Sequence, residues 1–564
     1  MDGEGTLAQL DSESSELFEA IAGREPESVR SGYLVIPRSD LTYAQGTTVP
    51  LLGVMRMVQR PSGLVVPTKG TGAQMAEMST AFMTAATFTG VSAPRSVAQT
   101  LASSHDTESF LAECATVMAL LRDPTISNRG AQLALAESRL SPKALETAKN
   151  LLQDDWAFLS AQSVLGVMKL ALSEAPLTPR EPKQLRADVT MAALVLADNL
   201  DRLEIDDTSP LWQGVVDPSL AVYLIQNQIF NHSVELGVIL GRWRRTRELA
   251  RQILPDLADT FDTLFQMATG TTPEILFNVG FGLLLHLQSH KEVLIPHNLL
   301  DQIKAPTAQV QAAVDLLAAD LPTLKAEVVG EIDSVGFEWA SNSFKRFPVL
   351  TTRDGSLLVL DPTFLCERIC GSAFFWEVFN FVKGGNTDGS GRTASQLRGE
   401  LGRFTGLVAE EYAVDRLSHI FDTSFGSVPR LLREADLQAL WPGESCCDVL
   451  IDGEHTWLAL DVVSHRVSAS ASQSGSVAAL EEDLRQIVDE KAAQLDATIR
   501  RLISNGGALP GQEPRSHASR YHPVVIAASG FPWNPFTSIA VQSRLRNLGL
   551  LTSPEVVSLG GSTN

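Results

Sequence analysis

The chain has 564 residues, of which 44% are hydrophobic and 20% are charged. This composition supplies apolar material for roughly two to four folded domains and excludes a disordered protein. The formal net charge of −21 opposes indiscriminate attraction to nucleic acid, so a nucleic-acid ligand requires a local basic groove.

The cysteines and the first residues indicate a cytoplasmic protein without a membrane span. The start of the chain is acidic and lacks the basic and apolar regions of a signal peptide. The most apolar run, Ile275 to Leu287, is shorter than the roughly 20 residues that cross a bilayer, and it predicts a buried helix. Five cysteines form no paired CxxC zinc spacing, and we interpret them as reduced thiols: Cys114, Cys366, Cys370, Cys446 and Cys447.

Residues 1–95 predict a small mixed α/β region. Short strand-like segments at Tyr33 to Ile36, Leu51 to Met55 and Gly63 to Val66 are separated by proline and glycine. The sequence assigns no role to this region.

Residues 96–345 predict a helical domain, because apolar residues recur at helical spacing in successive segments. We find no fixed repeat period that would indicate a solenoid. The expected helices span Ser109–Leu121, Pro142–Leu152, Ala157–Leu172, Ala187–Leu200, Ala221–Leu240, Arg247–Met267 and Ala308–Ala318.

Residues 346–395 predict a hairpin, an aromatic seam and a linker. The pair Asp354 and Gly355 is typical of a hairpin turn between two short apolar runs. An aromatic cluster from Phe374 to Phe381 favours core or an interdomain seam. The Gly/Ser-rich stretch from Gly384 to Ser395 then predicts a domain boundary.

Residues 396–564 predict an α/β domain, so that the chain as a whole is of the α+β or α/β class. A helix from Leu401 to Phe421 places Glu411 among apolar residues, and a hairpin turns at Asp452 and Gly453. A helix from Ala479 to Leu502 and an apolar strand from Pro523 to Ala528 follow. Strand, helix and strand in this order indicate a crossover onto one sheet.

Lys491 is the only lysine after Lys383, and it occupies the apolar stripe between Ile487 and Leu495. An ammonium group on such a face requires a partner. Asp448 and Asp461 stand on the two predicted hairpin strands, and two carboxylates with a lysine are the groups that a metal-dependent phosphodiesterase requires.

This order of elements and charges resembles the PD-(D/E)XK nuclease superfamily, the restriction-endonuclease-like fold, over about residues 395–551. The resemblance implies a mixed sheet flanked by helices, with acidic residues on adjacent strands that hold magnesium. It assigns Asp448 to the first acidic position, Asp461 to the second and Glu411 to the helix carboxylate.

Two positions depart from the family motif. Val463 stands where the family keeps its lysine, and Cys447 replaces the usual proline. Because some members supply the lysine from the following helix, the resemblance implies that Lys491 is a lysine that has migrated.

The chemistry gives each residue an expected role. Asp448, Asp461 and Glu411 offer the hard oxygen ligands that Mg²⁺ or Mn²⁺ prefers, and Lys491 orients the attacking water or offsets negative charge. Gln494, one turn further along the helix, is a weaker candidate for substrate contact. The alternatives are ordinary hydrogen bonds for the aspartates, a solvated or arginine-paired carboxylate for Glu411 and a solvated amine for Lys491.

A basic cluster in the helical domain is a second candidate for substrate contact. Arg242, Arg244 and Arg245 flank Trp243 and could bind phosphates. The alternative is a solvated helix face, or pairing of these arginines with acidic neighbours.

The sequence thus predicts a metal-dependent nuclease, with DNA favoured over RNA as the substrate and with a helical region that positions the substrate or a protein partner. The alternative is a nuclease-like scaffold without catalysis that binds nucleic acid or protein. A third possibility makes the helical region the functional part. The nuclease hypothesis requires the Lys491 amine to lie within about 6 Å of the Asp448 and Asp461 carboxylates. The sequence does not indicate the oligomeric state.

Overall fold

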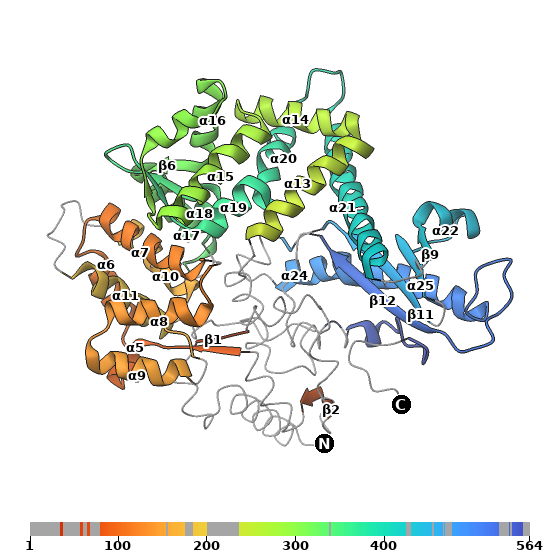
Figure 1. The fold of residues 1–564 in the computed structure, drawn as a ribbon, viewed down its shortest axis with the longest axis horizontal. Coiled ribbons are helices and arrows are strands. Elements are labelled where there is room, and N and C mark those ends of the chain that lie inside the picture. Colours follow the sequence, from red (N-terminus) through yellow and green to blue (C-terminus); the bar gives the residue numbers. More distant parts are fainter. Residues whose placement is uncertain are drawn as a thin grey trace.

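A computed structural model provides the structure of the chain (Figure 1). It describes residues 34–37, 57–59, 65–67, 79–123, 125–153, 156–174, 184–199, 236–337, 340–424, 430–453, 456–465, 467–468, 477–528, 541 and 544–556. The expected strand at Leu51 to Met55 lies outside these residues.

Two short strand pairs belong to the N-terminal region. Strands β1 (Leu34–Pro37) and β4 (Ser79–Phe82) are antiparallel, as are β2 (Met57–Gln59) and β3 (Val65–Pro67). A first group of helices follows, drawn in orange and gold in Figure 1: α5 (Ala85–Thr89), α6 (Arg95–Ala102), α7 (Thr107–Leu121), α8 (Asn128–Arg139), α9 (Pro142–Gln153), α10 (Ala161–Glu174) and α11 (Leu185–Ala197).

A second group of helices is drawn in yellow and green (Figure 1). Its helices are α13 (Leu236–Ile253), α14 (Pro255–Thr269), α15 (Pro273–His290), η3 (His297–Gln302), α16 (Thr307–Leu317), α17 (Leu321–Val335), α18 (Asn342–Arg346), α19 (Pro362–Cys370), η4 (Ser372–Phe375) and α20 (Trp376–Lys383). One hydrophobic core runs through both groups, from Met83 to Phe404. The two groups are therefore packed on each other through buried side chains.

A four-stranded sheet is built into the second group, in the order β5-β8-β7-β6. Its strands are β5 (Leu294–Ile295), β6 (Ala318–Asp320), β7 (Val349–Thr351) and β8 (Leu357–Val359). The antiparallel pairing of β7 with β8 confirms the hairpin expected around Asp354 and Gly355. Gly355 has a φ of +83°, a backbone conformation that favours glycine in such a turn.

The aromatic cluster near residue 374 lies inside the helical core. Phe374 is buried and stacks on Phe265 of α14, with ring centroids 5.1 Å apart. Phe261 of α14 also stacks on Phe404 of the next helix, with centroids 5.9 Å apart. These rings tie α14, η4 and the following helix together.

That following helix, α21 (Ala394–Ser424), is 31 residues long and joins the helical core to the C-terminal sheet. Its first half contributes Leu397, Leu401 and Phe404 to the helical core, and its second half contributes Val414 to a cluster on the sheet. The change from one core to the other therefore falls inside α21, later in the chain than the linker expected at residues 384–395.

The C-terminal sheet has the order β12-β11-β10-β9 and is mixed. Strands β9 (Arg430–Arg433), β10 (Val449–Asp452) and β11 (Thr456–Val463) are antiparallel neighbours, whereas β12 (Arg520–Ala527) is parallel to β11. The helical elements of this unit are α22 (Glu434–Leu440), α24 (Val477–Leu484), the π-helical turn η5 (Arg485–Asp489) and α25 (Glu490–Ser504). The parallel pairing confirms the expected strand, helix and strand crossover.

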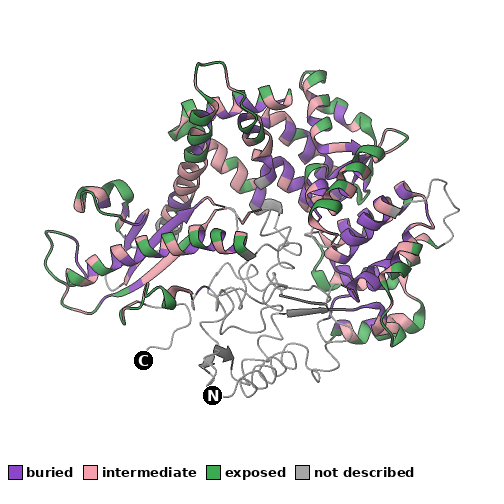
Figure 2. Ribbon diagram, turned by 180° about the vertical axis from the view of Figure 1, so that it is seen from behind, coloured by how far each residue is buried: buried purple, intermediate pink, exposed green. Residues whose placement is uncertain are grey.

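Helices cover both faces of this sheet. On one face, Trp457 and Ala459 of β11 pack with Leu495 and Ile499 of α25. On the other face, a cluster that includes Leu460 of β11 packs with Val414, Leu417 and other residues. Figure 2 shows buried residues along the strands, where these helices cover the sheet. Because successive residues of a strand alternate between faces, the odd-numbered residues of β11 face α25.

Several expected helix boundaries were wrong. The helices predicted at 221–240 and 247–267 are divided instead between α13 and α14, because Pro255 lacks an N–H group and begins a new helix. Only residues from Leu236 onward are described for the first of these. The helix predicted from Ala157 begins at Ala161, where the Ser160 hydroxyl accepts a hydrogen bond from the Ser163 N–H.

The chain is an α+β protein, with a mainly helical N-terminal part and a C-terminal mixed sheet flanked by helices, as the sequence predicts. Among the described residues, no helix is both long enough and apolar enough to span a membrane.

Candidate active site

Asp448 and Asp461 lie at one end of the C-terminal hairpin. The register pairs Val449 of β10 with Leu460 of β11, so Asp448 and Asp461 form the next position along the two strands. Asp461 is fully buried on the face that α25 covers. The turn at Asp452 and Gly453 therefore fixes the alignment of the two carboxylates.

Two hydrogen bonds hold Asp448 in place. The backbone N–H of Val462 donates to Asp448 Oδ2 at 2.6 Å. Next to it, the N–H of Cys447 donates at 3.0 Å to the hydroxyl of Thr498, a buried residue of α25. Helix α25 thus anchors the start of β10 as well as covering the sheet.

Lys491 reaches both aspartates from α25. Its Nζ lies 3.1 Å from Asp461 Oδ1 and 3.9 Å from Asp448 Oδ2. Burial alone would lower the pKa of Lys491, but the two carboxylates outweigh burial and raise this pKa above its ordinary value. The distance that the nuclease hypothesis requires is met, and the amine is an ion-pair partner instead of a solvated group.

The helix that carries Lys491 contains an irregular turn directly before it. Residues Arg485 to Asp489 form the π-helical turn η5, and Arg544 donates to both carboxylate oxygens of Asp489 at 2.7 to 2.9 Å. π-Helical turns are rare and are frequent at functional sites, because they change the direction in which the next side chains point. This ion pair holds the turn two residues before Lys491.

The carboxylate of α21 that senses the charge of Asp448 is Glu410, the neighbour of the expected Glu411. Burial, followed by the negative charge of Asp448, raises the pKa of Glu410 to about 7. Glu411 instead accepts hydrogen bonds from Arg433 Nη1 at 2.8 and 3.0 Å, as in the alternative expected for it. Helical spacing favoured Glu411, whereas the structure pairs Glu411 with Arg433 and subjects Glu410 to the charge of Asp448.

The ionised form of Asp461 is unfavourable in its surroundings, and its protein neighbours do not fully compensate for this. Burial and the nearby Asp448 charge raise its pKa to about 8, although Lys491 acts in the opposite direction. Its Oδ2 atom is buried, and no described group donates a hydrogen bond to it. A buried carboxylate oxygen without a donor is costly, and a cation would satisfy it.

The donor set fits a hard divalent cation with few protein ligands. Asp448 and Asp461 provide adjacent carboxylates, one with an unsatisfied oxygen. Within the described part of the chain, no group of three or more His, Cys, Asp or Glu side chains is arranged to hold a metal ion. Two carboxylates agree with the way Mg²⁺ binds, since it keeps several waters and uses one or two carboxylates with substrate phosphates.

The two departures from the family motif are core residues. Val463 is buried at the end of β11, and Cys447 is buried in the cluster under α25. Burial raises the pKa of the Cys447 thiol, which therefore stays protonated and apolar. The only lysine of the C-terminal unit reaches Asp461 from the helix instead of from β11.

The other expected substrate residues lie apart from this group or have partners. Gln494 is half-buried on α25, three residues after Lys491. Arg245 of α13 pairs with Asp415 of α21, with Nε to Oδ2 at 3.1 Å, and Arg244 pairs with Glu248. Arg242 donates to the Ala528 carbonyl at 3.4 Å, just after β12. The basic cluster therefore holds α13 against the C-terminal unit.

A histidine and aspartate pair follows β11 and was not expected from the sequence. His465 Nε2 lies 2.9 Å from Oδ1 of the buried Asp483 on α24, whose Oδ2 accepts from the Ser468 N–H at 2.7 Å. The two residues are 18 positions apart, so no local spacing indicated the contact. The pair fastens the segment after β11 to α24.

No protein-family model matches the chain, and no characterised protein or solved structure matches it either. The resemblance to the PD-(D/E)XK superfamily therefore depends on the residues and on their arrangement.

Proposed function

We propose that the C-terminal unit is a metal-dependent nuclease that hydrolyses phosphodiester bonds, with DNA favoured over RNA. The observation that carries this proposal is the convergence of Asp448, Asp461 and Lys491 at one end of a mixed sheet, with Glu410 nearby. A mixed sheet with a strand, helix and strand crossover supports the resemblance to the PD-(D/E)XK nucleases.

Asp448 and Asp461 would hold Mg²⁺ or Mn²⁺, with Glu410 as an additional carboxylate close to Asp448. When bound, the cation offsets negative charge on the scissile phosphate and lowers the pKa of an attacking water. The Val462 N–H keeps the Asp448 carboxylate oriented, because it binds one oxygen at 2.6 Å.

Lys491 supplies a fixed positive charge at the edge of the site. Its ammonium stays protonated because both aspartates raise its pKa, and it is only 20% exposed. A preorganised cation in a partly dry site stabilises developing negative charge more than the same cation in water. We assign Lys491 to the phosphate oxygens and to orientation of the water.

The proposed preference for DNA rests on the family resemblance. The proposed location in the cytoplasm rests on the state of the cysteines. The described residues contain no feature that separates DNA from RNA. All five cysteines are buried free thiols, in keeping with a reducing cytoplasm. The net charge of −21 means that the substrate must approach a local surface, because the chain as a whole repels phosphates.

The experiment that tests this function is cleavage of linear, circular and single-stranded DNA and of RNA with Mg²⁺ or Mn²⁺. We expect Asp461→Asn to lower cleavage by at least about 100-fold, because the cation loses a carboxylate worth several kcal/mol of charge stabilisation. Asp415→Asn is the matched control, since Asp415 pairs with Arg245 away from the site.

Two results would contradict the proposal. Cleavage that survives in Asp461→Asn would place the activity elsewhere or in a contaminant. No cleavage of any substrate by the folded wild-type protein, with metal present, would favour a silent scaffold.

The scaffold is the second candidate function, and one contact favours it. The Lys491 ammonium lies 3.1 Å from Asp461 Oδ1 and so partly offsets the negative charge that would attract a metal ion. A protein of this kind would bind nucleic acid or a protein partner without cutting it. Titration of the protein with Mn²⁺ in a calorimeter separates the two, since the nuclease binds the cation in an Asp461-dependent manner and the scaffold does not.

A further inference from the structure

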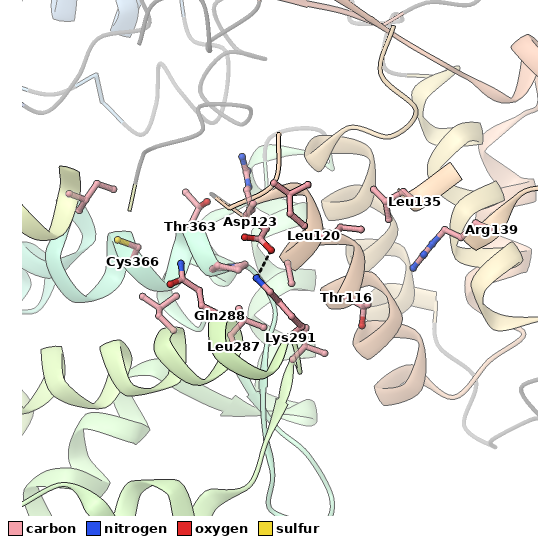
Figure 3. Close-up of a pocket in the computed structure, with 17 residues that line it drawn as sticks. Thr116, Leu120, Asp123, Leu135, Arg139, Leu287, Gln288, Lys291, Thr363 and Cys366 are labelled. Atoms are coloured by element: carbon pink, nitrogen blue, oxygen red, sulfur yellow. Dashed lines mark hydrogen bonds and ion pairs between the residues drawn. The ribbon is translucent and has the colours of Figure 1, made fainter. Parts of the chain in front are cut away.

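A cleft of about 240 Å³ lies between the two groups of helices, apart from the candidate active site. Helices α7 and α8 form one wall, and α15, the residue Lys291 that follows it and the start of α19 form the other (Figure 3). None of its lining residues belongs to the C-terminal sheet or to α25.

The cleft walls are mainly aliphatic. They include Leu120 of α7, Leu135 of α8, Ile239 of α13, and Leu284 and Leu287 of α15. Protein interiors are close-packed, so an apolar space of this size between two layers is suited to an apolar guest.

The charged residues that line the cleft are predominantly basic. Arg122, Arg139 and Lys291 face it, whereas Asp123 is the one acidic residue among the lining residues that the structure describes. Among the lining residues themselves, cations therefore outnumber acids, although the chain as a whole carries a net charge of −21.

Each cation of the lining has an acidic residue nearby. Asp123 is 6% exposed, and its oxygens accept from Lys291 Nζ at 2.6 Å and from the N–H and hydroxyl of Thr125. Glu113 pairs with Arg139, and Asp361 lies 3.8 Å from Arg122, but neither acid lines the cleft.

Lys291 retains donor capacity, because an ammonium has three N–H groups and Asp123 takes one. Its side chain is 53% exposed, and Figure 3 shows it reaching from the end of α15 toward Asp123.

Further polar groups of the lining lack partners within the protein. Arg139 Nε is buried, and no described group accepts its hydrogen bond. Among the described residues, no hydrogen bond is formed by the Gln288 amide or the Thr363 hydroxyl, and both line the cleft. Figure 3 shows Arg139 pointing from α8 toward the helix that carries Thr116.

We propose that this cleft binds a small amphipathic carboxylate, whose apolar body fills the space between α7 and α15 and whose anionic group meets Lys291. Apolar walls supply affinity through burial, and the surplus of donors selects an acceptor over a donor. Such a ligand would join the two helical groups, so its binding stabilises their packing.

The test uses octanoate as the probe, with 1-octanol and octylammonium as neutral and cationic probes of equal chain length. The full chain is titrated with each probe in a calorimeter. We expect one octanoate per chain, bound at least about tenfold more tightly than 1-octanol, a difference of about 1.4 kcal/mol. Octylammonium is expected to bind most weakly.

Three variants locate the site. Ala119→Phe fills the cleft from α7 and is expected to weaken both octanoate and 1-octanol by at least about tenfold. Thr116→Phe fills it from an exposed position and serves where Ala119→Phe fails to fold. Lys291→Gln is expected to lower octanoate binding to the level of 1-octanol, whereas Lys149→Gln on the surface of α9 leaves it unchanged.

Each other result overturns a part of the proposal. Equal affinities for octanoate and 1-octanol would show that the cleft does not recognise an anionic group. Octanoate binding that neither filling variant weakens places the ligand elsewhere, and no octanoate binding to the folded wild-type chain overturns the site. None of these results depends on nuclease activity.

Discussion

Two charged clusters of this chain are both candidates for ligand binding in sequence, but they differ in structure. The arginines of α13 find partners within the protein: Arg245 pairs with Asp415, Arg244 with Glu248, and Arg242 with a backbone carbonyl. At the end of the C-terminal sheet, the described part of the chain places Lys491 near three carboxylates, those of Asp448, Asp461 and Glu410.

The difference indicates which cluster is prepared for a ligand. Charges that neutralise one another hold two elements together and need nothing further. The Asp448 charge helps to raise the pKa of both Asp461 and Glu410, and one Asp461 oxygen stays unsatisfied, an arrangement typical of functional sites. The following experiments test this contrast, from the largest expected effect to the smallest.

Replacing Lys491 by methionine removes the cation that, among the described residues, pairs with Asp448 and Asp461, while keeping an unbranched side chain. We expect cleavage to fall about 10²- to 10³-fold, as for loss of one preorganised electrostatic group. Affinity for Mn²⁺ is expected to hold or to rise, because no ammonium competes for Asp461. Single-turnover cleavage and calorimetry measure the two, and loss of Mn²⁺ binding as well would indicate a structural role for Lys491.

The raised pKa values predict an unusual pH dependence of stability. The Asp461 pKa rises from 3.8 to about 8 and the Glu410 pKa from 4.5 to about 7, so between these limits the folded metal-free chain holds protons that the unfolded chain has lost. Stability therefore decreases as pH rises through this range, by up to about 1.4 kcal/mol per pH unit for each group.

Chemical denaturation of the metal-free chain at a series of pH values measures this slope. Asp461→Asn is expected to reduce it, and Mg²⁺ to oppose it by binding the ionised carboxylates. A slope unchanged in Asp461→Asn would mean that Asp461 is ionised across the range.

The adjacent glutamates of α21 provide a matched pair. Glu410→Gln is expected to lower cleavage about tenfold, roughly 1.4 kcal/mol, because it removes a carboxylate beside Asp448. Glu411→Gln is expected to leave cleavage within about twofold, because Glu411 binds Arg433 at the surface. Steady-state rates at saturating Mg²⁺ distinguish them, and the opposite order would restore Glu411 as the metal ligand.

The smallest effect is expected at α13. Arg245→Gln breaks a half-buried pair with Asp415, and we expect kcat and KM for DNA to change less than about twofold. A KM that rises severalfold, and more steeply at low salt, would instead identify the α13 arginines as a phosphate-binding surface.

Much of the C-terminal unit is determined by local sequence. The Asp452 and Gly453 turn sets the hairpin register, and the register brings Asp448 opposite Asp461. The period of the helix around Lys491 directs its amine toward the sheet. The family resemblance rests on these same residues and implies a role for both aspartates and for the lysine.

Tertiary structure decided the rest, because it depends on contacts between residues far apart in the chain. Glu410 and Glu411 are both possible from helical spacing, and only the packing of α21 on the sheet selects the one that faces Asp448. The partners of Arg245 and Arg242 of α13 are 170 and 286 residues away, and the π-helical turn before Lys491 is held by Arg544. Local periodicity carries no information on contacts between residues so far apart in the chain. The sequence therefore determined the chemical groups, and the tertiary fold determined which of them meet.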